Sequence, residues 1–102
     1  VGNFFFIRSM LSLELDLSVI QTKEELMEWL RKSFDFPSYF GGNWDAVEEC
    51  LYHSCAEDTE ILLMNEDDLS DELETELPRL ERILKNFNNA GELSITLVHE
   101  ED

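Results

Sequence analysis

The chain has 102 residues, which is the size of one domain with one hydrophobic core. It carries 24 acidic residues against 7 Lys and Arg, a formal net charge of -17. This charge disfavours direct binding to nucleic acid or to an anionic membrane, because both need clustered cations, and it favours the approach of a basic protein.

The N-terminal stretch, residues 1–10, is interpreted as an extension ahead of a single domain over residues 11–102. Its apolar run Phe4–Ile7 is too short to cross a bilayer, and the stretch lacks the basic start and cleavage motif of a signal peptide. The run Asn3–Arg8 fits either an extra strand or a tail that covers a sheet edge. Leu11–Leu17 then alternates apolar and polar residues strictly, which predicts a strand with one buried face.

Thr22 begins the first predicted helix. With Glu25 it forms a capping box, in which the hydroxyl and the carboxylate satisfy free backbone N–H groups. Apolar residues follow at helical spacing, and Pro37 ends the helix by that point. After a loop with two glycines, Asn43 is a good N-cap for a second helix that runs to about Ser54.

The second half of the chain begins with a buried strand predicted over Glu60–Met64. An acidic helix over Asp67–Leu77 follows, and Pro78 is predicted to begin a further helix because proline suits a first helical position. Leu93–Val98 is the last predicted strand. Strands separated by helical crossovers indicate an α/β fold, a small three-stranded parallel sheet packed with helices, with a fourth strand if the N-terminal run joins.

The chain offers little that could support catalysis. Cys50 and His53 have the spacing of one helical face, but a nucleophilic pair needs an exposed thiol, and Cys50 falls on the apolar face of its helix. Histidines and cysteines are too few for a metal site, and no phosphate-binding glycine loop occurs. We therefore expect no enzyme, no metal and no cofactor.

Cys50 and Cys55 would point in different directions on one helix, so no disulfide is expected between them. Reduced thiols are typical of a reducing compartment, which predicts a cytoplasmic location.

The predicted second helix has two contrasting faces. One narrow arc carries three carboxylates and a phenol: Asp45, Glu48, Glu49 and Tyr52. The opposite side is apolar, with Trp44 at its border, and no Lys or Arg occurs between Ser33 and Leu77. A solvated face is the ordinary interpretation of such a charge run. The preceding loop, however, carries Tyr39 and Phe40, which we expect to be exposed, and aromatic residues beside charge are typical of binding sites.

The segment over residues 36–51, FPSYFGGNWDAVEECL, resembles the signature of the barstar family. That signature has the form L/F-P-x-Y-Y/F-G-x-N-x-D-A-x-W-D-C-L, and the match has no gaps. The predicted order of elements also agrees over residues 11–98. The resemblance implies a small three-stranded parallel sheet with helices, and a cytoplasmic inhibitor of a microbial ribonuclease. In the family, the helix after the tyrosine-containing loop blocks the active site of the enzyme.

The resemblance also implies roles for single residues. By position, Tyr39 matches a stacking tyrosine, Asn43 the helix cap and Asp45 the first interface acid. Glu49 stands where the family has its most important interface aspartate. It keeps the charge and places it about one methylene further out.

Two departures from the family pattern leave the partner open. Glu48 replaces the usual tryptophan, and Asn86 stands at the position of an interface glutamate on the last helix. The first hypothesis is an immunity-type protein, a monomer that binds a basic microbial ribonuclease. The second is an acidic interaction module whose partner is not a nuclease. Both use the same predicted partner-binding residues: Tyr39, Asn43, Trp44, Asp45, Glu48, Glu49 and Tyr52.

Overall fold

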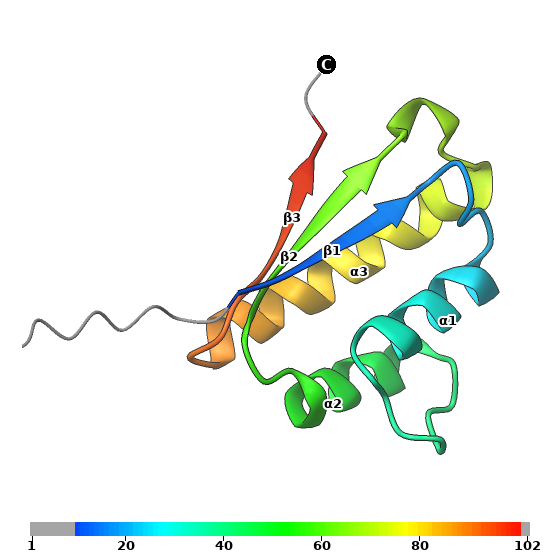
Figure 1. Ribbon diagram of the computed structural model, residues 1–102. Coiled ribbons are helices and arrows are strands. Elements are labelled where there is room, and N and C mark those ends of the chain that lie inside the picture. Colours follow the sequence, from blue (N-terminus) through cyan, green and yellow to red (C-terminus); the bar gives the residue numbers. More distant parts are fainter. Residues whose placement is uncertain (1–9, 101–102) are drawn as a thin grey trace, which may run out of the picture.

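Three parallel strands form the sheet of this protein, in the spatial order β1-β2-β3 (Figure 1). They are β1 (Met10–Asp16), β2 (Asp58–Met64) and β3 (Ile95–His99). The middle strand β2 pairs in parallel with both neighbours. The predicted α/β fold with a three-stranded parallel sheet is therefore confirmed. The structure, a computed structural model, describes residues 10–100, so the run Asn3–Arg8 lies outside the described residues.

The helices pack on one face of this sheet (Figure 1). Successive residues of a strand point to opposite faces. Leu15, Ile61 and Ile95 point toward the helices and are buried in the core. Glu14 and Glu60 fall on the alternate positions, which remain at least partly exposed. The sheet thus has one apolar face under the helices and one more polar face that no helix within residues 10–100 covers.

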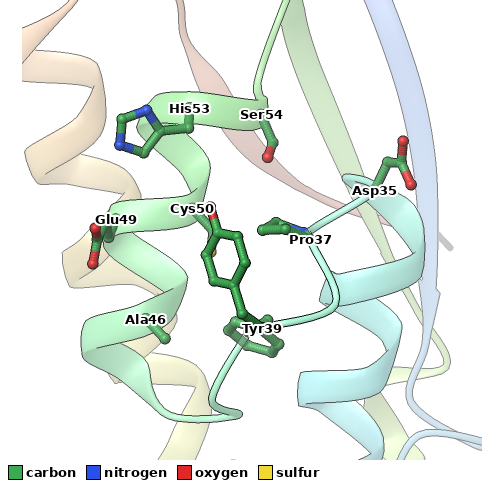
Figure 2. Close-up of a pocket in the computed structure, with 9 residues that line it drawn as sticks. Asp35, Pro37, Tyr39, Ala46, Glu49, Cys50, His53 and Ser54 are labelled. Carbon is green, nitrogen blue, oxygen red and sulfur yellow. The ribbon is translucent and has the colours of Figure 1, made fainter.

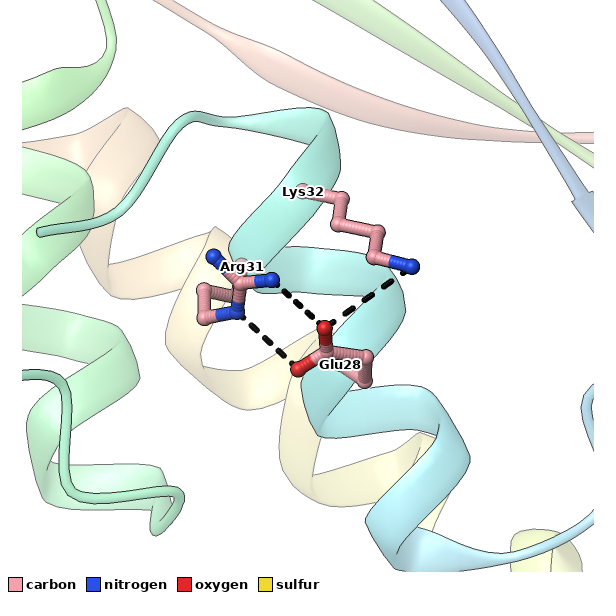
Figure 3. Close-up of polar contacts among 3 residues, drawn as sticks. All are labelled: Glu28, Arg31 and Lys32. Carbon is pink, nitrogen blue, oxygen red and sulfur yellow. Dashed lines mark hydrogen bonds and ion pairs between the residues drawn. The ribbon is translucent and has the colours of Figure 1, made fainter. Parts of the chain in front are cut away.

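The first helix, α1 (Lys23–Ser33), begins at the predicted capping box. The Thr22 Oγ1 accepts a hydrogen bond from the Glu25 N–H at 3.0 Å, and the Glu25 carboxylate accepts one from the Thr22 N–H at 3.1 Å. On its outer side Glu28 pairs with Arg31 at 2.6 Å and with Lys32 at 3.8 Å (Figure 3). These pairs are exposed and contribute little to stability.

The last helix, α3 (Asp71–Ala90), is continuous, so the prediction of two helices divided at Pro78 is wrong. Ser70 caps it, and the preceding acidic residues form a short 3-10 helix, η1 (Glu66–Asp68). Pro78 removes one backbone N–H from the helix, which costs about 3 kcal/mol. Its ring lies on the exposed side, and the apolar stripe continues in phase past it. Each buried leucine contributes about 1.5–3 kcal/mol, so the stripe outweighs the missing bond. The stripe consists of Leu73, Leu77, Leu80, Ile83, Leu84 and Phe87.

Asp16 joins the ends of β1 and β2. Its Oδ1 accepts hydrogen bonds from the Ser18 hydroxyl at 2.6 Å, the Asn65 side-chain amide at 2.7 Å and the Ser18 N–H at 3.0 Å. These bonds favour the ionised carboxylate and lower the pKa of Asp16 below its usual value. Because the pKa is lower in the folded chain, this stabilisation is present above the unfolded pKa and is lost as pH falls through the folded one.

Asp16→Asn is therefore expected to lower the melting temperature at pH 7, and to lower it by less in acid below the folded pKa. Thermal unfolding of both proteins across acidic and neutral pH measures the difference. Glu14→Gln, an exposed change on the same strand, serves as the control. Equal losses for Asp16→Asn at both ends of the pH range would contradict the assignment.

Candidate functional site

Helix α2 (Trp44–Ser54) carries most of the predicted site, and its first turn is held by Asn43. The Asn43 Oδ1 accepts a hydrogen bond from the Ala46 N–H at 2.8 Å, so the predicted cap is confirmed. Gly42, directly before it, has φ 69°, a left-handed conformation that favours glycine. This turn brings the capping residue into position at the start of the helix.

The inner face of α2 is apolar, as predicted. Val47, Cys50 and Leu51 are all buried in the core. Burial, and then the neighbouring charge of Glu49, raises the pKa of the Cys50 thiol. A thiol with a raised pKa is a poor nucleophile at neutral pH. This face therefore holds the helix in place and does not supply a reactive group.

The outer face of α2 presents the three predicted carboxylates. Asp45 and Glu49 are exposed, and Glu48 is half-buried. Within residues 10–100 no hydrogen bond or ion pair engages any of the three carboxylates. They are also close enough along the helix to repel one another. No described residue thus compensates their charge, which is available to a cationic partner.

The two aromatic residues of the loop before α2 differ in exposure. Tyr39 is 81% exposed, as predicted. Phe40 is half-buried, and its ring lies 5.1 Å from that of Phe36, so the expectation that it is exposed is wrong. Phe36 in turn stacks on Phe34 at 5.9 Å. The buried aromatic residues anchor the loop and leave Tyr39 as its projecting side chain.

A cavity of about 330 Å³ separates this loop from α2 (Figure 2). Tyr39 lies on the loop side, while Glu49 and His53 come from successive turns of α2. Asp35, whose φ of 54° turns the chain at the end of α1, also lines it. The cavity is therefore lined by an exposed aromatic residue and by two acidic residues.

The sequence patterns did not indicate that Asp35 or His53 belongs to the site. The four-residue spacing of Glu49 and His53 on one helix was a usable signal for the histidine. For Asp35 the sequence carried no comparable signal, because its position depends on how the chain leaves α1.

The comparison with known families agrees with this arrangement. The family model for barstar (barnase inhibitor) matches residues 10–98. This chain belongs to the barstar family. Members of that family are ribonuclease inhibitors and not enzymes, which confirms the predicted function class. A search of curated proteins gave no match. None of the helices within residues 10–100 is long and apolar enough to cross a membrane.

Two of the residues predicted to bind the partner also hold this barstar-family helix on α3. At the start of α2, the half-buried Trp44 donates a hydrogen bond from its Nε1–H to the Glu76 Oε2 at 2.8 Å. At its end, the ring of Tyr52 lies 5.3 Å from that of Phe87. Both contacts lie between α2 and α3, beside the outward carboxylates.

The Asn43 cap gives a direct stability test. Asn43→Ala is expected to lower the free energy of unfolding by about 1 kcal/mol, because the Ala46 N–H loses its acceptor. Urea denaturation measures the change. Asn43→Asp keeps a capping oxygen and should retain most of the stability. Equal losses in the two variants would show that the side-chain oxygen contributes nothing.

Proposed function

We propose that this barstar-family protein inhibits a basic, barnase-like ribonuclease by covering the active site of the enzyme with the acidic face of α2. The observation that carries the proposal is the set of three carboxylates on one rigid helix with no partner among the described residues: Asp45, Glu48 and Glu49. Tyr39 projects beside them.

The chemistry of the target supports this pairing. An enzyme that binds RNA through its phosphates presents clustered cations in its active site. Carboxylates at fixed positions can occupy the place of those phosphates and pair with the same cations. The net charge of -17 steers a basic enzyme toward the inhibitor before contact.

The predicted interface comprises seven residues with different tasks. The three carboxylates pair with cations, and Tyr39 supplies an aromatic surface that stacks on the partner. The other three position the helix and border its acidic face: Asn43, Trp44 and Tyr52. The inhibitor acts as a monomer in the cytoplasm, where two free cysteines remain reduced.

Titration of basic microbial ribonucleases with the purified protein tests this proposal. Cleavage of a fluorogenic RNA should cease at a one-to-one ratio for at least one enzyme. Association should slow as salt rises, because the Debye length falls to about 10 Å at 0.1 M. If no ribonuclease in the panel were slowed at equimolar inhibitor, the proposal would be wrong.

A second candidate is an acidic interaction module with a non-nuclease partner. It is favoured by Glu48 and Asn86, which differ from the residues implied by the family signature. Affinity capture from native lysate separates the two candidates. A captured non-nuclease that is lost with Asp45→Ala and Glu49→Ala would favour the second.

A further inference from the structure

The hydrogen bond between Trp44 and Glu76 links residues 32 apart in the sequence. Trp44 is the first residue of α2, directly before Asp45, and Glu76 lies in α3. The indole Nε1–H donates to the Glu76 Oε2 at 2.8 Å. This short, charge-assisted bond fixes the first turn of α2 against α3.

Glu76 is an unusual residue to find at this place. It is only 8% exposed, and carboxylates are rarely buried unless they are paired. Arg79 approaches it at 3.9 Å, which is beyond hydrogen-bond distance, and the Arg79 side chain is largely exposed. The indole is therefore the close donor to this carboxylate among the described side chains. The pair is a specific contact between two helices and is more than apolar packing.

We propose that Trp44 and Glu76 are positioning residues for the acidic face of α2. Their bond holds the start of the helix, and the Tyr52–Phe87 ring contact holds its end. With both ends fixed, the carboxylates between them have set positions before the partner arrives. The inference rests on the proposed function, since the positioned groups are those that would pair with the enzyme.

The consequence for binding follows from the geometry of charge pairs. A desolvated pair depends on the placement of both charges, so a helix free to tilt would lose part of each interaction. Loss of the Trp44–Glu76 bond leaves the outward charges unchanged. Diffusional encounter should therefore stay the same, while the complex should dissociate faster.

Trp44→Phe tests this with a matched control in the same chain. It removes the indole N–H and keeps an aromatic ring. Trp29→Phe makes the same chemical change in α1, where the Trp29 Nε1–H donates to the Glu14 backbone oxygen at 3.1 Å. With a ribonuclease that the wild-type protein inhibits, we expect Trp44→Phe to raise the dissociation rate about tenfold and Trp29→Phe to leave it nearly unchanged. Association rates should match in all three proteins.

Glu76 provides the reciprocal test. Glu76→Gln keeps an oxygen acceptor for the indole and should dissociate within about twofold of wild type, which is the usual error of such comparisons. Glu76→Leu removes the acceptor and should behave like Trp44→Phe. Combining Glu76→Leu with Trp44→Phe should add little further, because the two residues act through one bond.

Amide hydrogen exchange in the free protein gives a readout that needs no partner. Exchange in the first turn of α2, at residues 46–49, should speed up in Trp44→Phe and not in Trp29→Phe. Unchanged exchange, together with equal dissociation rates in the two variants, would overturn the positioning role. A wild-type protein that inhibits no ribonuclease would instead count against the proposed function, and the exchange experiment would still decide the role of Trp44.

Discussion

Replacing Glu49 by alanine is expected to weaken binding of the ribonuclease by about 2–5 kcal/mol, because the cation opposite it would be left buried and unpaired in the complex. The stability of the folded chain should hardly change. Glu49 is exposed, and its carboxylate makes no hydrogen bond or ion pair within residues 10–100. Removing it also relieves repulsion with Asp45 one turn earlier. The free energy of unfolding should therefore stay within about 0.5 kcal/mol of wild type.

Calorimetry for affinity, at one fixed salt concentration, and urea denaturation for stability measure the two effects. Glu14→Ala is the matched control, since it removes the same charge from the sheet face that none of the described helices covers. Affinity that falls for Glu49→Ala and not for Glu14→Ala would assign the effect to the site and not to net charge. The proposed site would be wrong if both Asp45→Ala and Glu49→Ala bound the enzyme as tightly as wild type.

Local patterns predicted the elements that carry this site. The strict alternation over Leu11–Leu17 identified β1, and the Thr22 and Asn43 caps identified the starts of two helices. The two faces of α2 followed from helical spacing alone. These predictions were correct because each depends only on residues that lie close together in the sequence.

Features that depend on contacts between distant segments could not be predicted from the sequence. Pro78 was predicted to begin a helix because proline strongly prefers the first helical position. Burial of the apolar stripe on both sides of Pro78 instead keeps α3 continuous. Phe40 looked like an exposed loop residue, but Phe36 holds it inward. The bond between Trp44 and Glu76 joins two helices with a strand between them in the chain. No single-sequence periodicity reports such a pairing.

Leu51→Ala is expected to have the largest effect on stability of the changes considered for α2. Leu51 is 0% exposed and lies on the inner face of the helix, directly beneath the acidic one. Truncating a buried leucine removes its transfer free energy and leaves a cavity, which together cost about 2–5 kcal/mol. Against a typical total of about 5–15 kcal/mol, that is a large fraction of the free energy of unfolding.

Measurements of stability and affinity distinguish the role of the inner face of α2 from that of its outer face. Urea denaturation should show the large loss for Leu51→Ala, while Leu51→Met, which nearly conserves volume, should lose less than about 1.5 kcal/mol. Under conditions where the variant is fully folded, its affinity for the ribonuclease should fall far less than that of Glu49→Ala, because Leu51 carries none of the outward charge. If affinity fell as steeply in Leu51→Ala as in Glu49→Ala, packing and binding would not be separable on α2. The inner face would then have to be counted as part of the recognition site.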